Sequence, residues 1–154
     1  MKGKKIGCLV LALLLLACSL ALCACGVAGR YTGELGGEYK ITASSIRRLD
    51  VPVSFTAGGS TIDASVDIVY MYDLEEQEGT QEEKIIHMYL KRVLYNGENE
   101  YVQEQVDAIN QSIEQDEDFR FYYFGNLKLA KQTSGSFSAG DGYIKINGER
   151  LSKK

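Results

Sequence analysis

The sequence is poor in the residues on which metal, redox and nucleophilic chemistry usually depends. It has one histidine, one proline and no tryptophan in 154 residues, and its four cysteines all lie within the first 25 residues. The cysteine-free remainder cannot hold a disulfide framework, a thiolate zinc site or a cysteine nucleophile. One histidine also leaves little room for a multi-histidine metal site or a proton relay. We therefore predict no metal, no cofactor and no catalytic residue.

The overall composition is that of a single globular domain. Hydrophobic residues make up 45% of the chain and charged residues 25%. These values are ordinary for a folded protein and too apolar for a disordered one. The length is also that of one modest domain.

The first 24 residues have the pattern of a secretory signal peptide. Lys2, Lys4 and Lys5 form a positive start, and residues 6–24 contain no charge. Such a segment is a targeting signal and is not counted as part of the predicted fold. Its apolar run is also long enough to span a bilayer as an uncleaved anchor, so an anchor and plain secretion remain as alternatives.

The residues at the end of this segment favour a lipoprotein over an uncleaved anchor or plain secretion. The sequence LCACG at residues 22–26 resembles the lipobox of bacterial lipoproteins, in which an aliphatic and a small residue precede an obligatory cysteine. The resemblance implies that Cys25 becomes the first residue and carries at least two acyl chains, because one chain binds membranes only marginally. Cys18 is a second candidate, but it would leave apolar residues 20–22 on the mature protein. We therefore expect an extracytoplasmic protein anchored to a membrane by lipid on Cys25.

The mature chain would be acidic. Removing residues 1–24 removes three lysines and changes the net charge from −4 to −7. Nucleic acids and anionic lipid surfaces both favour clustered lysine and arginine. We therefore predict no nucleic-acid binding, and contact with the membrane through the lipid alone.

Periodicity divides the mature chain into strands, then helices, then strands. Residues 25–37 are interpreted as the lipidated cysteine and a glycine-rich tether that leads into a first strand near 31–35, and residues 38–150 as a single α+β domain. The clearest strands form a hairpin of residues 51–56 with 61–72, in which Pro52 indicates an edge or a strand start. Residues 143–146 are predicted as the last strand, before a basic tail.

Helical spacing of apolar residues predicts a packed helical pair at about 82–115. The first helix rests on three apolar pairs at 85–86, 89–90 and 93–94, and Asn96-Gly97 can end it. Asn99 can cap the second helix, whose apolar residues are spaced 4, 3 and 4 apart from Val102. A β-hairpin at Asn96-Gly97 is the alternative. The predicted fold class is α+β, with an antiparallel sheet that is either open or barrel-like.

A second resemblance concerns the start of the mature chain. The sequence GRYTG at residues 29–33, followed by short antiparallel strands, resembles the start of small lipocalin-like lipoprotein domains. This resemblance implies a barrel. The helical segment at 82–115 departs from the pattern of that family.

One aromatic strand carries the predicted binding residues. Alternation along residues 119–124 places Phe119, Phe121 and Tyr123 on one face and Tyr122 and Phe124 on the other, beside Arg120. A strand with one solvent-exposed face should alternate apolar and polar residues. Because both faces of this strand are aromatic, both should be covered. Either the helical pair packs on the second face, or Tyr122, Phe124 and Arg120 line a ligand groove or partner surface.

These patterns favour a non-enzymatic binding or accessory module for a protein partner or a small ligand. The alternatives are a small hydrolase of envelope polymers and a purely structural envelope lipoprotein. His87 would have to be the base of any serine hydrolase, and we expect it at the margin of a helical apolar stripe. The sequence places no pair of carboxylates for acid–base catalysis.

Overall fold

The structure is a computed structural model that describes residues 26–79, 82–115 and 118–154. The predicted signal peptide and both lipidation candidates, Cys18 and Cys25, lie outside these residues. The described chain forms, in order, β1 (Gly29–Gly33), β2 (Glu38–Ile41), β3 (Ser45–Ala57), β4 (Ser60–Glu76), β5 (Lys84–Leu94), α2 (Glu100–Glu114), β6 (Phe121–Phe124), β7 (Leu127–Ala130), β8 (Gln132–Gly140), β9 (Tyr143–Ile146) and β10 (Glu149–Lys153).

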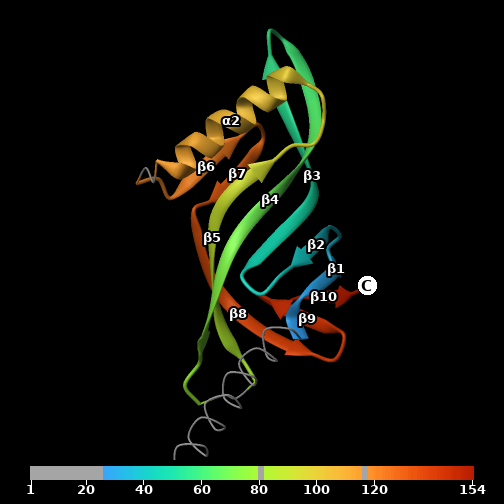
Figure 1. The fold of residues 1–154 in the computed structure, drawn as a ribbon, viewed down its shortest axis with the longest axis vertical. Coiled ribbons are helices and arrows are strands. Elements are labelled where there is room, and N and C mark those ends of the chain that lie inside the picture. The colour runs from blue at the N-terminus through green and yellow to red at the C-terminus, as the bar shows by residue number, and fades with distance from the viewer. Residues whose placement is uncertain (1–25, 80–81, 116–117) are drawn as a thin grey trace, which may run out of the picture.

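Eight of these strands close into an antiparallel barrel (Figure 1). Their order around the barrel is β1-β10-β9-β8-β5-β4-β3-β2, so the chain runs up and down, with α2, β6 and β7 inserted between β5 and β8. The antiparallel sheet and its barrel form are therefore confirmed. Lipocalins share this up-and-down architecture. The resemblance to lipocalin-like domains itself stays a prediction.

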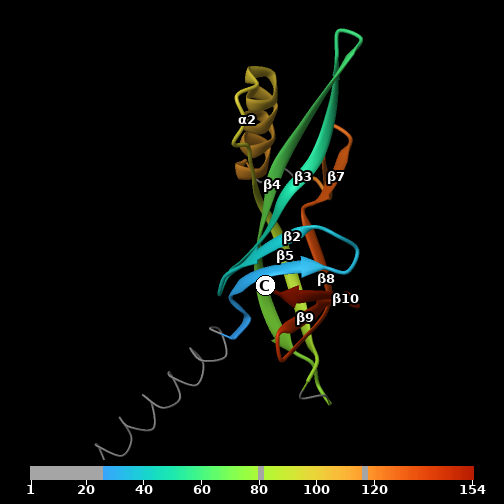
Figure 2. The ribbon, with the colours of Figure 1, turned by 90° about the vertical axis from the view of Figure 1, so that its right-hand side faces the viewer.

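Three long strands continue beyond the barrel into an extension, where α2 and the β6–β7 hairpin lie beside them (Figures 1 and 2). Strand β2 pairs with β3 only at residues 46–49, so β3 then continues with β4 as its strand partner. The predicted hairpin is confirmed, because Val51 pairs with Val66 and Ala57 with Ser60. Pro52 tolerates its place here because this part of β3 is an edge.

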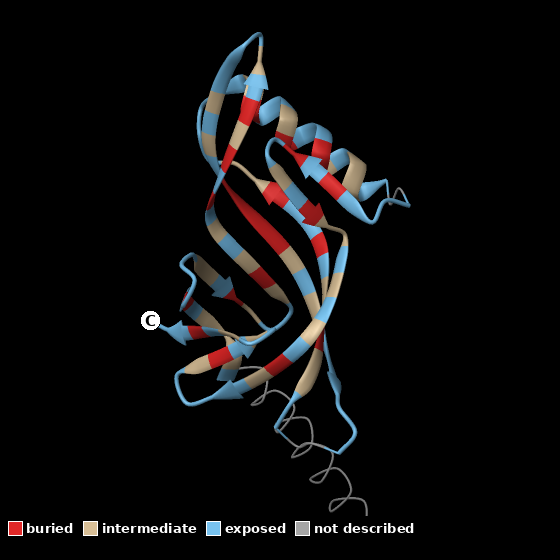
Figure 3. Ribbon diagram, turned by 180° about the vertical axis from the view of Figure 1, so that it is seen from behind, coloured by how far each residue is buried: buried red, intermediate tan, exposed pale blue. Residues whose placement is uncertain are grey.

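The buried apolar residues gather in two clusters, one in the barrel and one in the extension (Figure 3). The barrel core consists of Tyr31, Ile41, Ile46, Ile86, Phe137, Ile144 and Leu151. The extension core consists of Val51, Val53, Phe55, Val66, Ile68, Leu90, Val93, Val102, Val106, Ile109, Tyr122, Phe124 and Leu129. Strands β3, β4 and β5 thus contribute to both.

The first predicted helix is wrong, because residues 84–94 form strand β5. Its register against β4 shifts so that Leu90 pairs with Tyr70 but Arg92 pairs with Val69, which leaves Lys91 as a bulge. A bulge reverses the alternation of a strand. The inward residues Ile86, Leu90 and Val93 therefore follow the spacing of a helix although the backbone is extended.

The second predicted helix is confirmed as α2. The Asn99 side chain accepts a hydrogen bond from the backbone N–H of Val102 at 3.2 Å, which caps the helix. Val102, Val106 and Ile109 are buried, as their spacing predicts. The hairpin alternative is consequently wrong for its second arm, since a helix follows β5.

The strands reach beyond the predicted domain limits of 38–150. Strand β1 lies inside the segment interpreted as a tether, and the predicted basic tail forms β10. Tyr31 pairs with Lys153 and Gly33 with Leu151. Strands β1 and β10 therefore meet to close the barrel, a pairing that local sequence patterns do not reveal.

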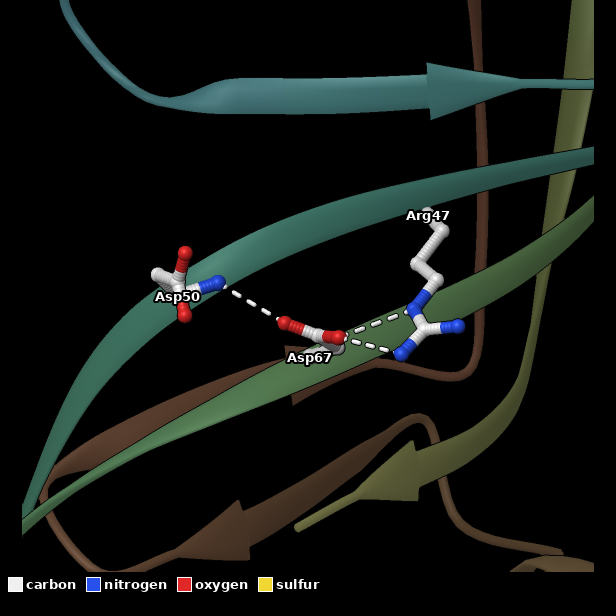
Figure 4. Close-up of polar contacts among 3 residues, drawn as sticks. All are labelled: Arg47, Asp50 and Asp67. Atoms are coloured by element: carbon white, nitrogen blue, oxygen red, sulfur yellow. Dashed lines mark hydrogen bonds and ion pairs between the residues drawn. The ribbon is translucent and has the colours of Figure 1, made fainter. Parts of the chain in front are cut away.

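A buried carboxylate holds the point where β3 leaves the barrel (Figure 4). The Asp67 side chain accepts hydrogen bonds from Arg47 at 2.5 and 2.9 Å and from the backbone N–H of Asp50 at 2.8 Å. Asp50 has a φ of 50°, and the β3–β4 register shifts between Arg48 and Val51. Asp67 thus stabilises a bulge that redirects β3, which suits charge-assisted bonds in a buried place.

Candidate functional site

The interior of the barrel changes from apolar to polar along its axis. The barrel core fills one end. Toward the β1–β2 and β9–β10 turns, the strands present polar side chains on the same inward face, because side chains of a strand alternate with a period of two. Arg48 follows the inward Ile46, and Glu149 precedes the inward Leu151. We call this polar end the mouth of the barrel.

A cavity of about 430 Å³ opens at the mouth. Its apolar wall includes Leu35, Ile46, Met88, Ile146 and Leu151, and its polar wall Tyr39, Arg48, Tyr70, Thr133, Asn147 and Glu149. Small-molecule sites commonly enclose roughly 300–1,000 Å³ with mostly apolar walls and a few polar groups. This mouth cavity has that size and that mixture. An eight-stranded barrel is also just wide enough to hold one small ligand.

Two polar atoms in the wall of the mouth cavity are buried without a partner. Thr133 Oγ1 and Glu149 Oε1 make no hydrogen bond within the described chain. A buried polar group without a partner costs about 1–3 kcal/mol, more when it is charged. Most buried polar groups in folded proteins are paired, so each exception needs an explanation. The described chain by itself therefore leaves both polar groups unsatisfied.

Glycines on the inward face make room for these polar side chains. A Cβ atom at Gly33 would lie 2.5 Å from Glu149 Oε1, and one at Gly135 would lie 1.5 Å from Asn147 Oδ1. Asn147 itself has a left-handed backbone, with a φ of 52°. The carboxylate and the amide can therefore enter the barrel only because two facing positions lack a side chain.

Two tyrosines of the mouth have raised pKa values. Burial raises the pKa of Tyr39, the Glu149 carboxylate raises it further, and the Arg48 guanidinium partly offsets both effects. Burial also raises the pKa of Tyr70, again offset in part by Arg48. The mouth cavity therefore has a cation and an anion close to the same phenol.

Two of the residues predicted to bind a ligand, Tyr122 and Phe124, lie away from the mouth cavity, and their burial agrees with the alternative in which a helix packs on this face. Tyr122 is 5% exposed and Phe124 2% exposed, and both belong to the extension core. The Phe124 ring packs edge-to-face on Phe55, with centroids 5.0 Å apart. The exposed aromatic residues on this strand are instead Phe121, at 41%, and Tyr123, at 73%. The predicted alternation of side chains along residues 121–124 is confirmed. Which of the two faces is buried depends on where α2 packs.

Tyr122 and Phe124 also border a hollow of about 210 Å³ beneath α2. The buried Tyr122 hydroxyl has no hydrogen-bond partner among the described residues. This hollow is smaller than the roughly 300 Å³ at which small-molecule sites usually begin. Its size suits ordered water better than a ligand.

Arg120, the third predicted binding residue, is exposed just before β6. Together with Phe119, Phe121 and Ser134 it lines a surface depression of about 450 Å³, which shares Thr133 with the mouth cavity. Its backbone carbonyl accepts a hydrogen bond from the Lys131 N–H. The structure therefore separates Arg120 from the two aromatic residues with which it was grouped.

His87 lies on strand β5 rather than on a helix, and it connects two neighbouring strands. Its Nδ1 lies 2.7 Å from Ser134 Oγ on β8, and its Nε2 lies 3.0 Å from Glu75 Oε2 on β4. His87 and Ser134 are direct cross-strand partners. When Nε2 carries the proton and donates to Glu75, Nδ1 is free to accept the Ser134 proton. Sequence analysis missed this chain because the three residues meet only through strand register.

The described chain shows neither a cluster of metal-ligating side chains nor a helix suited to span a membrane. No group of three or more histidine, cysteine, aspartate or glutamate side chains there is placed to hold a metal ion. Within residues 26–79, 82–115 and 118–154, no helix has the length and apolar character needed to cross a membrane.

The sequence pattern shows which strand face the residues of the mouth cavity share, but it does not show that this face is the inside of a barrel. Thr133 and Glu149 share a strand face with the buried Phe137 and Leu151, yet that face is fixed as the inward one only when the barrel closes.

The chain was also compared with known proteins. No protein-family model, no curated protein and no solved structure matches it.

Proposed function

We propose that this protein is a lipid-anchored, extracytoplasmic binding module that holds a small ligand in the mouth cavity. One observation carries the proposal: a cavity of about 430 Å³ has two unpaired buried polar atoms, Thr133 Oγ1 and Glu149 Oε1, in its wall. Unpaired polar groups in an apolar pocket are the features by which a site fixes and selects a ligand. In this proposal the module holds its ligand without changing it chemically.

The anchor belongs to the same proposal and rests on sequence alone. The positive start, the uncharged run and the LCACG sequence at 22–26 support lipid on Cys25. Such an anchor would keep the binding cavity at the membrane surface. Two acyl chains hold a protein on a membrane stably, whereas one does not.

A pair of substitutions on adjacent residues tests the cavity. Thr133→Phe places a ring in the cavity, while Ser134→Phe adds the same bulk at the next residue of β8, whose side chain lies on the opposite face. We expect Thr133→Phe to weaken binding of the neutral, apolar fluorescent dye N-phenyl-1-naphthylamine to the full-length protein about tenfold or more. Ser134→Phe should bind as the wild type does.

The readout is the dye's fluorescence titration, and circular dichroism verifies that both variants fold. Equal dye binding by folded Thr133→Phe and Ser134→Phe proteins would show that the mouth cavity is not the binding site.

Fatty-acid labelling tests the anchor. Cells that express the wild type should incorporate radioactive palmitate into the protein, and Cys25→Ser should abolish the label. Cys18→Ser serves as the control and should keep it. Label that survives in Cys25→Ser would contradict the assignment.

Hydrolysis of an ester is the second candidate function, and the Ser134–His87–Glu75 chain is the observation that favours it. In this reaction Ser134 Oγ attacks the ester carbonyl as His87 takes its proton, and the alcohol leaves with that proton. A water molecule that gives a proton to His87 then attacks the acyl group, and Ser134 regains the proton as the acid is released. The chain lies on the exposed outer side of the sheet, where water weakens electrostatic assistance, so this function ranks second.

A comparison of two serines on β8 tests this candidate. Ser134→Ala removes the nucleophile, while Ser136→Ala changes an exposed serine two residues away. Hydrolysis of p-nitrophenyl acetate by the full-length protein should fall in the first variant and not in the second. Equal rates in both variants would eliminate the serine mechanism.

A further inference from the structure

The mouth cavity has charges of opposite sign on two separate strands. Arg48 of β3 and Glu149 of β10 both line it. Within the described chain, neither side chain forms an ion pair. Glu149 Oε1 is buried without a partner, and an unpaired buried charge is poorly solvated, whereas Arg48 is exposed to water at the edge of the cavity. Both charges are therefore available to a molecule that enters the cavity.

The two charges are close enough to act on one side chain. Tyr39 pairs directly with Arg48 across β2 and β3, and both Arg48 and Glu149 shift the pKa of its hydroxyl. Between them the wall is apolar, with Ile46, Met88 and Leu151. The wall thus presents a cation, an apolar surface and an anion within a single small volume.

We infer that the mouth cavity binds a small zwitterionic amphiphile, in which an ammonium group lies near Glu149, an anionic acid group near Arg48, and an apolar body on Ile46, Met88 and Leu151. This inference rests on the proposed function, since it names the ligand class of the same cavity. A carboxylate can only accept hydrogen bonds and an ammonium can only donate them, so the two groups match. Arginine pairs equally well with carboxylate and phosphate oxygens.

Ligands with a single charge fit the cavity less well. A purely anionic ligand would leave Glu149 unpaired and would bring more negative charge close to it. A purely cationic ligand would leave Arg48 unpaired and would bring more positive charge close to it. Leaving one member of a close charge pair unmatched reduces affinity strongly. The cavity should therefore select against both, and this selection distinguishes the inference from simple uptake of apolar molecules.

Two sources supply this ligand chemistry. One is an apolar amino acid or short peptide with free ends, and the other is the headgroup region of a zwitterionic lipid such as phosphatidylethanolamine. Both contain an ammonium group, an anionic oxygen group and an apolar body. The experiment therefore includes one arm for each source.

The test uses the full-length protein in phosphatidylglycerol vesicles and the dipeptide leucyl-phenylalanine in four forms: free, N-acetylated, C-amidated and blocked at both ends. Equilibrium binding of the radiolabelled compounds is measured. We expect the free form to bind at least about tenfold more tightly than either singly blocked form. Replacing part of the phosphatidylglycerol with phosphatidylethanolamine should displace the dipeptide if lipid is the occupant, and leave its binding unchanged if a soluble zwitterion is.

Charge variants assign the two ends of the ligand. Arg48→Gln should remove the advantage of the free dipeptide over its amide, and Glu149→Gln should remove its advantage over the N-acetyl form. Arg30→Gln, on an exposed position of β1, should change nothing. If all four forms bind alike, or the doubly blocked form binds best, the inference is wrong.

The dye titration separates this failure from failure of the proposed function. Dye binding that is lost in Thr133→Phe, together with no preference for the free dipeptide, would overturn the zwitterion inference and leave the binding module standing. If Thr133→Phe leaves dye binding unchanged and the free dipeptide is not preferred, the zwitterion inference and the proposed binding module are both overturned.

Discussion

The barrel core and the extension core are made by the same three long strands but are closed in different ways. In the extension, α2 and the β6–β7 hairpin cover the strands and fill the interior with apolar side chains. In the barrel, the sheet closes on itself, and its apolar core reaches only to the mouth cavity. A closed sheet satisfies its backbone hydrogen bonds whether or not its centre is full. The barrel can therefore close around an unfilled volume, whereas the extension is filled with apolar side chains.

At the junction between the barrel and the extension, strand β3 has to change direction. Strand β3 must change direction between Arg48, which lines the cavity, and Val51, which belongs to the extension core. The bulge at Asp50 makes this change, and Asp67 holds it with three hydrogen bonds. The junction thus places one strand in two environments.

The largest expected effect distinguishes the extension core from its outer surface. Phe124→Ala should lower the free energy of unfolding by about 3–5 kcal/mol, because it leaves a cavity among buried side chains. The control Tyr123→Ala removes the adjacent, 73% exposed aromatic and should cost less than about 0.5 kcal/mol. Urea unfolding measures both. Binding of the dye should survive Phe124→Ala at low temperature, and its loss would mean that the two regions are not independent in function.

The next effect concerns how closely the β6–β7 turn approaches β3. Gly125 has a φ of 54°, and a Cβ there would lie 2.5 Å from the Ser54 carbonyl oxygen. We expect Gly125→Ala to cost about 2–3 kcal/mol, from left-handed strain plus the clash. Gly58→Ala is a matched control with a φ of 57° and no atom within 4 Å, so it should cost only about 1 kcal/mol. Equal thermal midpoints in the two variants would contradict the close packing of this turn.

The junction should show a smaller effect. Asp67→Ala leaves Arg47 and the Asp50 N–H without their acceptor, at a cost of about 1–3 kcal/mol. Asp63→Ala removes an exposed carboxylate that accepts only from Ser54 Oγ, and should be close to neutral. Chemical unfolding compares them. A neutral Asp67→Ala would show that the bulge holds without its carboxylate.

The smallest effect belongs to the mouth and depends on pH. The pKa of Tyr70 is raised by burial, so the folded state favours the neutral phenol. Its contribution to stability is complete below the ordinary tyrosine pKa of 10.0 and is lost as pH rises through the raised value. Tyr70→Phe should therefore flatten the alkaline decline of the unfolding free energy while changing stability little at pH 7. An unchanged decline, measured by denaturant unfolding above pH 10, would contradict the burial of this hydroxyl.

Sequence patterns predicted the local elements well where one signal was enough. The β3–β4 hairpin followed from strict alternation on both sides of a glycine turn, and α2 followed from its apolar spacing and the cap at Asn99. Strand β5 was mistaken for a helix because the bulge at Lys91 reverses its alternation. Tyr122 and Phe124 were assigned to the correct common face, but that face is the interior.

The sequence by itself determined the hairpin, the helix and the pairing of aromatic faces, since periodicity and caps act within a few residues. Only the tertiary structure decided which face of each strand is the inside and that β10 closes the barrel on β1. These two decisions bring Arg48, Thr133 and Glu149 to one cavity. A strand offers two equivalent faces, and which of them is buried depends on the strands and helices that cover it.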